Sequence, residues 1–293
     1  MEKNKTQWDW DAFLYLAPAL LIIFTFHVFP ILLAFLISFY KWNLITDARY
    51  VGLVNYQKII NDPMFWKAIK NTIFYAIGSV PLGILIALSI ALLLNNKLKG
   101  LGIYRTLYFL PVITSMNAVS MVWQWIYHER YGVLNYFISL VGLGPINWLE
   151  DVSFAMPAII IMSVWKSLGY NVVIFLAGLQ NIPTHLYEAA EIDGASPWQR
   201  FLHITFPLLS PVTFFVLVMS TISSFQVFAQ VYILTPNGGP MGSTTVLVYY
   251  LYQMAFNRFR FGYAAAIAFV LFLIIFAMTA FQKFVIEKRV HYR

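Results

Sequence analysis

The segment Tyr187-Glu188-Ala189-Ala190-Glu191-Ile192-Asp193-Gly194-Ala195 is a short charged island between two apolar stretches that are each long enough to cross a membrane. It holds three acids and a glycine in a chain that is 60% hydrophobic. A membrane protein has little reason to keep such an island unless something soluble docks there. The island therefore predicts a site that transmits motion to a partner, and it points away from catalysis within this chain.

The composition of the whole chain is that of a membrane protein. Only 11% of its 293 residues are charged, whereas a soluble domain carries about 25%. No aspartate or glutamate occurs between residues 63 and 128, or between residues 195 and 286. Acid-free blocks of this length are typical of helices in lipid, where a central charge costs several kcal/mol.

Six segments approach or exceed the length of about 20 apolar residues that a membrane-spanning helix needs. Alternation of apolar and polar residues with period two is absent, so a membrane β-barrel is not expected. We therefore predict an all-α integral membrane protein with one transmembrane domain over residues 1–293. The predicted spans are 12–40, 69–94, 104–127, 153–178, 206–234 and 262–285.

The charges outside the spans give an orientation. The net charge is +7, and the basic residues flank apolar segments, which is typical of contact with lipid headgroups and not with nucleic acid. The short loop at 95–105 and the C-terminal tail are basic, which favours the cytoplasmic side. With six spans both termini are then cytoplasmic, and so is the loop at 179–205.

This loop reads as two short helices joined by a glycine corner. Thr184 is the expected N-cap of the first helix, and Gly194 suits the left-handed position that ends it. Ser196 is the expected cap of the second helix, with Pro197 at its first position. Gln199, three residues after Ser196, completes a capping-box pattern.

Residues 187–211 read YEAAEIDGASPWQRFLHITFPLLSP and resemble the cytoplasmic signature of permease subunits of binding-protein-dependent ATP-binding-cassette (ABC) importers. The residues that fall in place are Glu188, Ala189, Ala190, Gly194, Ile204, Pro207 and Pro211. The resemblance implies that the loop is the helix seated in a cleft of the ATPase subunit. It assigns ATPase coupling to Glu188, Ala189, Ala190, Asp193, Gly194, Ala195 and Pro207.

The likeness extends over nearly the whole chain. Residues 104–111 (YRTLYFLP), 131–135 (YGVLN), 235–240 (TPNGGP) and 262–266 (GYAAA) look like the carbohydrate branch of these importers, which serves maltose, glycerol 3-phosphate and multiple sugars. The resemblance implies the type I permease fold in a bacterial or archaeal cytoplasmic membrane. The loop at 235–260 resembles a region that meets the binding protein, with a membrane-surface helix as the competing interpretation.

The resemblance also implies the partners. They are a second, related permease subunit, two cytoplasmic ABC ATPase subunits and an extracytoplasmic solute-binding protein. No G-x-x-x-x-G-K-[ST] phosphate loop occurs in the chain. No cofactor or metal is therefore expected here, and ATP and magnesium belong to the ATPase subunit. The chain itself is not expected to be an enzyme.

One group of polar residues inside the spans is a candidate substrate path. Lys166 lies midway along its predicted span, and an ionisable group in a membrane is a functional hypothesis by default. The candidate path residues are Lys166, Gly169, Tyr170, Asn171, Ser223 and Gln226. The alternatives are ordinary hydrogen bonds between helices and pairing of Lys166 with the partner permease.

Two other classes of protein remain as rivals. An ion-coupled secondary transporter of small solutes predicts inverted repeats and acids at the membrane midplane. An integral membrane enzyme needs a buried cluster of catalytic groups. Neither pattern is evident in the sequence, so the importer permease is the preferred interpretation.

Overall fold

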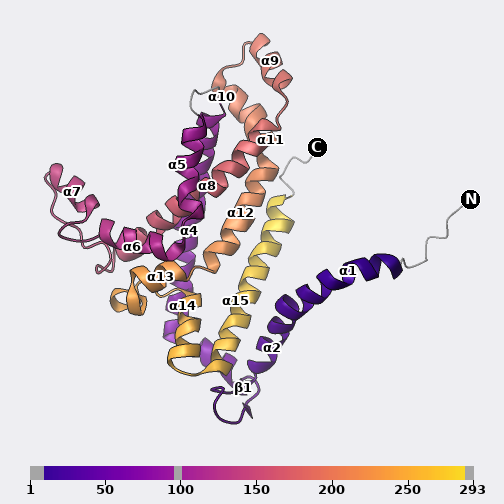
Figure 1. Ribbon diagram of the computed structural model, residues 1–293, viewed down its shortest axis with the longest axis vertical. Coiled ribbons are helices and arrows are strands. Elements are labelled where there is room, and N and C mark those ends of the chain that lie inside the picture. Colours follow the sequence, from indigo (N-terminus) through magenta and orange to yellow (C-terminus); the bar gives the residue numbers. More distant parts are fainter. Residues whose placement is uncertain (1–9, 96–100, 288–293) are drawn as a thin grey trace, which may run out of the picture. The chain divides into compact units, whose positions relative to one another are not determined.

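The computed structural model describes residues 10–95 and 101–287. Within these ranges the regular elements are helices and one hairpin of two-residue strands, β1 (Tyr40–Lys41) and β2 (Arg49–Tyr50), so the all-α prediction is confirmed. The described residues form two compact units, and Figure 1 labels the helices and the first strand along the chain. Of the described residues, unit 1 comprises 10–61 and 251–272, and unit 2 comprises 62–95, 101–250 and 273–287.

The helices are numbered in chain order, and π- and 3-10 helices carry the symbol η. The first part of the chain contains α1 (Trp10–Ile23), η1 (Phe24–Val28), α2 (Phe29–Ile37), α3 (Val54–Ile60), α4 (Pro63–Leu94), α5 (Leu101–Ile113), α6 (Met116–Ile126) and α7 (Val133–Leu140). The middle contains α8 (Ala155–Gln180), α9 (Thr184–Ile192), α10 (Pro197–Arg200), η2 (Phe201–Thr205), α11 (Phe206–Leu208) and α12 (Ser210–Phe225). The last part contains α13 (Ala229–Leu234), η3 (Pro236–Gly238), η4 (Pro240–Gly242), α14 (Leu247–Tyr252), η5 (Gln253–Asn257), α15 (Phe261–Phe281) and η6 (Gln282–Ile286).

Four helices in the described ranges are long and apolar enough to cross a membrane. They are Phe13–Ile37, Pro63–Leu94, Ala155–Gln180 and Phe261–Ile286. Two further pairs qualify only as broken spans: Gly102–Ile113 with Met116–Ile126, bent by 101°, and Pro197–Leu208 with Ser210–Phe225, bent by 62°. The expected six spans are reached if each bent pair is one span. The single transmembrane domain stays a prediction.

Unit 2 is built around the packing of α4 on α8. Asp62 caps α4 by accepting hydrogen bonds from the N–H groups of Met64 (2.9 Å) and Phe65 (3.4 Å). Small residues then line the buried face of α4 at helical spacing: Ala68, Ala76, Gly83, Ala87 and Ala91. Small side chains allow close approach of helices in a membrane, where packing replaces the hydrophobic effect as the main attraction.

Two of the spans differ in their bounds from the prediction. The helix predicted at 69–94 begins at Pro63, because Asp62 caps it there. Lys67, which the prediction placed outside the span, lies within this helix and donates to the Met241 carbonyl. The span predicted at 206–234 is interrupted after Phe225, and α13 starts a new helix at Ala229. No proline or glycine marks this interruption in the sequence.

One buried amide and one glycine make close backbone contacts inside unit 1. Asn55 Nδ2 donates to the carbonyl oxygens of Ser38 (2.7 Å) and Tyr40 (3.0 Å), which fixes α3 against the start of the hairpin. Gly262, at the start of α15, lies against the same strand, and its N–H donates to the Trp42 carbonyl at 3.3 Å. A Cβ at this glycine would lie 1.8 Å from the Tyr40 carbonyl oxygen.

Replacing Gly262 with alanine should therefore destabilise unit 1. We expect a loss of about 1–3 kcal/mol, because an added methyl group in a packed site forces backbone shifts. The measurement is thermal unfolding of the purified protein in detergent. Gly144→Ala is the control, since no atom lies within 4 Å of its added Cβ. Equal melting temperatures for the two variants would contradict the described packing.

Candidate functional site: a docking corner and a polar cavity

The helices α9 and α10 meet at a corner that the sequence predicted. The N–H of Ala195 donates to the Ala190 carbonyl at 2.9 Å, and the N–H of Gly194 donates to the Glu191 carbonyl at 3.1 Å. This pair of bonds closes an α-helix whose next residue is left-handed. Gly194 has φ +77°, a conformation that costs a residue with a Cβ about 1–2 kcal/mol.

The start of α10 is a complete capping box, as predicted. Ser196 Oγ accepts from the Gln199 N–H at 3.3 Å, and Gln199 Oε1 accepts from the Ser196 N–H at 2.8 Å. The prediction that Thr184 caps α9 is wrong. Pro183 is the N-cap and Thr184 is the first helical residue, because the extended Pro183 already turns the chain and its carbonyl accepts from Leu186.

The tip of the corner is exposed and partly apolar. Ile192 is 87% exposed and Trp198 is 66% exposed, beside the exposed Glu188, Ala189 and Asp193. Exposed apolar side chains rimmed by polar residues are typical of protein contact sites. The corner thus offers a contact surface with carboxylates at its edge.

The corner is firmly attached to the rest of unit 2. The hydroxyls of Tyr187 and Thr205 hydrogen-bond at 2.9 Å, which ties α9 to η2. Leu186 and Ile204 pack against a buried apolar cluster. That cluster contains residues of three long helices: Ala87, Ala91 and Leu94 of α4, Val172, Phe175, Leu176 and Leu179 of α8, and Val216 of α12. The corner is therefore packed against residues of α4, α8 and α12 together.

Between the same helices lies a polar cavity of about 350 Å³. This volume is within the ~300–1,000 Å³ range of small-molecule sites. Its lining combines hydroxyl, amide and ammonium groups with a few apolar side chains: Tyr75, Ser79, Val80, Gly83, Met116, Ser163, Lys166, Ser167, Tyr170, Asn171, Met219, Ser220, Ser223, Ser224 and Gln230. The cavity can form many hydrogen bonds to a polar solute inside an otherwise apolar bundle.

Four of the six candidate path residues line this cavity: Lys166, Tyr170, Asn171 and Ser223. Gly169 and Gln226 are not among its lining residues. Gly169 faces α5 instead, where a Cβ would lie 2.1 Å from the Tyr108 carbonyl oxygen. Gln226 is exposed at the end of α12. Transport through the cavity stays a prediction for all six.

Sequence reasoning missed the polar residues at one end of the cavity. Gln230 Nε2 lies 3.5 Å from the Tyr75 hydroxyl and 3.4 Å from Ser163 Oγ, which links α13, α4 and α8. Ser163 could have been found, because it precedes Lys166 and Ser167 by three and four residues and so shares their helix face. Gln230 could not, because the interruption before α13 has no sequence signal.

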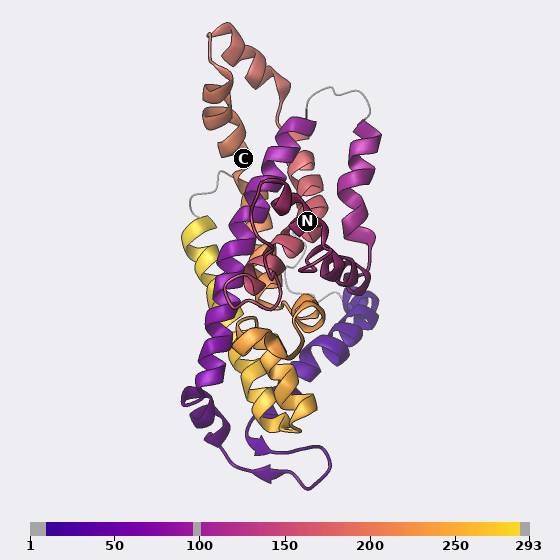
Figure 2. The same ribbon diagram turned by 90° about the vertical axis from the view of Figure 1, so that its left-hand side faces the viewer.

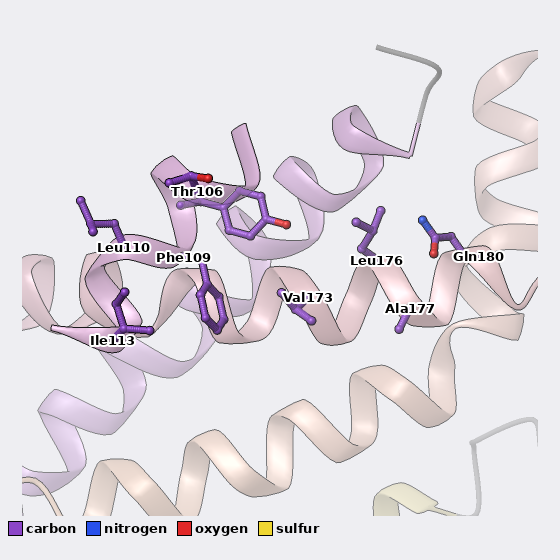
Figure 3. A pocket seen from close by; sticks show the side chains of 9 residues that line it. Thr106, Phe109, Leu110, Ile113, Val173, Leu176, Ala177 and Gln180 are labelled. Carbon is purple, nitrogen blue, oxygen red and sulfur yellow. The ribbon is translucent and has the colours of Figure 1, made fainter. Parts of the chain in front are cut away.

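A second cavity, of about 490 Å³, lies between α5 and α8 and contains none of the candidate residues (Figure 3). Its lining is mainly apolar: Thr106, Tyr108, Phe109, Leu110, Ile113, Val173, Leu176, Ala177 and Gln180. Such a lining suits an apolar group and not a polyhydroxyl solute.

In the part of the chain that the structure describes, no group of three or more His, Cys, Asp or Glu residues could hold a metal ion.

Known proteins are similar over most of the chain. Residues 79–291 match the family described as the inner membrane component of binding-protein-dependent transport systems. A lactose transport system permease protein of Rhizobium radiobacter is 38% identical, covering 97% of both chains. A trehalose/maltose transport system permease protein of Thermococcus litoralis is 36% identical, covering 91% of this chain and 90% of the relative.

The fold is also that of a solved transporter. The crystal structure of a bacterial ABC transporter involved in the import of the acidic polysaccharide alginate superposes with a TM-score of 0.83 at 23% identity, and it covers 97% of both chains. This match confirms the predicted permease fold. Proteins of this kind are not enzymes, because a separate ATPase supplies the energy. The chain belongs to the family of inner membrane components of binding-protein-dependent transport systems and is a multi-pass membrane permease subunit of an ABC importer.

Proposed function

We propose that the solute is a sugar and that it passes through the polar cavity of unit 2. The observation that carries this proposal is the lining of hydroxyl and amide groups, which matches the many donors and acceptors of a sugar. Two relatives support it, since their names assign them to lactose and to trehalose or maltose transport. The binding protein would deliver the sugar from outside.

The corner between α9 and α10 is the proposed contact with the ATPase. Its rigid backbone, its exposed Ile192 and its edge of carboxylates suit a groove with an apolar floor and basic rim. The coupling residues are Glu188, Ala189, Ala190, Asp193, Gly194, Ala195 and Pro207. ATP and magnesium are bound by the ATPase, because this chain has no phosphate-loop motif.

The proposed assembly holds a second related permease, two ATPase subunits and the extracytoplasmic binding protein. Within unit 2, α9 and α10 lie at the end where α4 ends and α5 begins (Figure 2). This arrangement supports a common cytoplasmic side for the loop at 179–205 and the loop at 95–105. The proposal that both termini share this side rests on the expected count of six spans alone. Lys97 and Lys99, which favoured this orientation, lie outside the described residues.

The mechanism is alternating access. ATP binding closes the ATPase pair, the corner moves with it, and the shared apolar cluster passes this motion to α4, α8 and α12. These helices line the cavity, so its opening changes sides. A ligand needs about 5.5 kcal/mol of differential affinity to convert a 1:99 population into 99:1. ATP binding supplies this difference in the proposed cycle.

Replacing Gly194 with valine should uncouple the corner. The left-handed backbone at this position, φ +77°, disfavours a β-branched residue by at least about 1–2 kcal/mol. We expect normal membrane insertion but a several-fold loss of transporter-stimulated ATP hydrolysis. The measurement is ATPase activity of the purified complex, with Gly144→Val as control. Wild-type stimulation in the Gly194 variant would refute the docking role.

Replacing Asn171 with leucine should slow transport strongly without loss of assembly. Asn171 is buried and lines the cavity, so the change removes hydrogen-bonding groups at the proposed path. We expect at least about a tenfold lower uptake, from loss of one or more hydrogen bonds to the solute. The measurement is uptake of radiolabelled lactose and maltose by proteoliposomes that hold the complete importer.

The matched control is Asn61→Leu, since Asn61 is exposed and donates only to the nearby Gln57 carbonyl. Unchanged uptake in the Asn171 variant would exclude the cavity as the path. Uptake of neither sugar by the unmodified importer, followed by uptake of a solute of another class, would exclude a sugar as the solute.

A further inference from the structure

The polar cavity carries charge of one sign, and that charge is positive. Among the described residues that line it, Lys166 is the only charged one, and the remaining polar groups are hydroxyls and amides. The acids Glu129 and Glu150 line a separate cavity with residues of the 235–240 loop. In the described part of the chain, Lys166 forms no ion pair.

The position of Lys166 leaves part of its ammonium available to a solute. Its Nζ donates one hydrogen bond, to the Val112 carbonyl at 3.0 Å. This carbonyl belongs to the last turn of α5, where the 101° bend into α6 ends the helical hydrogen-bonding pattern. A lysine ammonium has three N–H donors, and the half-buried side chain lines the cavity.

The surroundings of Lys166 favour a negative partner. A cation inside a membrane protein usually pairs with an acid, because hydrocarbon does not solvate the charge. Here hydroxyls and amides surround it, and none of the described lining residues carries the opposite charge. An anionic group in the cavity would gain a charge-assisted hydrogen bond from Nζ, which is about twice as strong as a neutral one.

We propose that Lys166 makes the cavity selective for sugars that carry a negative group, such as a uronate, a sulfonate or a phosphate. The inference rests on the proposed function and adds a substrate class to it. Ring hydroxyls would bind the serine and amide groups, and the anionic substituent would lie against Nζ. Neutral sugars would keep the first set of contacts and lack the second.

The competing role of Lys166 is structural, because its bond to Val112 caps the end of α5. The variant Lys166→Gln separates the two roles. Glutamine keeps an N–H donor for the Val112 carbonyl and removes the charge. Lys58→Gln is the matched control, since Lys58 is an exposed lysine of α3 and lines none of the described cavities.

The test measures equilibrium binding to the assembled transporter in phosphatidylcholine nanodiscs, with saturation-transfer NMR as the readout. The probes are D-glucuronate and D-glucose, which share a ring and differ in the carboxylate. We expect glucuronate to bind at least about tenfold more tightly than glucose, as for one hydrogen bond to a charged group. Lys166→Gln should remove this preference and leave glucose binding unchanged, whereas Lys58→Gln should keep it.

The possible failures are distinguishable. Equal binding of the two sugars to the unmodified transporter overturns the charge preference and leaves the proposed function intact. A preference that persists in Lys166→Gln overturns the assignment to Lys166, and a loss of both sugars in that variant shows a structural cap. Binding of neither sugar to the unmodified transporter overturns the proposed function as well.

Discussion

Hydrocarbon offers no hydrogen-bond partner, so a backbone group freed by a break in a spanning helix must find one within the protein. Two breaks of unit 2 meet this constraint with a side chain. Lys166 donates to the Val112 carbonyl at 3.0 Å, and Ser210 donates to the Pro207 carbonyl at 2.6 Å. Lys166 also lines the polar cavity, so this one side chain serves both the break after α5 and the cavity.

The same helices serve the corner and the cavity. The apolar cluster beneath α9 contains residues of α4, α8 and α12, and those three helices also supply most of the cavity lining. Close packing keeps them together, since a Cβ at Gly178 of α8 would lie 2.8 Å from a methyl group of Val212 on α12. Packed interiors transmit strain because they have few voids.

The family assignment leaves the rival of an ion-coupled transporter without support.

Local signals predicted the local structures. The glycine corner and the capping box at Ser196 were legible because each depends on a few neighbouring residues, and the apolar blocks predicted helices because lipid excludes charge. Tertiary contacts could not be predicted from the sequence, because they join residues that are far apart in it. The interruption before α13 has no proline or glycine, and the role of Gly169 in packing against α5 depends on a helix far away in sequence. Gln230 lines the cavity from α13, the helix that starts after this interruption.

The most direct test of the account is the side of the membrane on which the corner lies. The chain has no cysteine, so Ile192→Cys, at a site that is 87% exposed, introduces one unique thiol. A membrane-impermeant maleimide should label this thiol in inside-out vesicles stripped of the ATPase, and bound ATPase should protect it. Labelling in intact cells, from the outer face, would contradict the coupling mechanism.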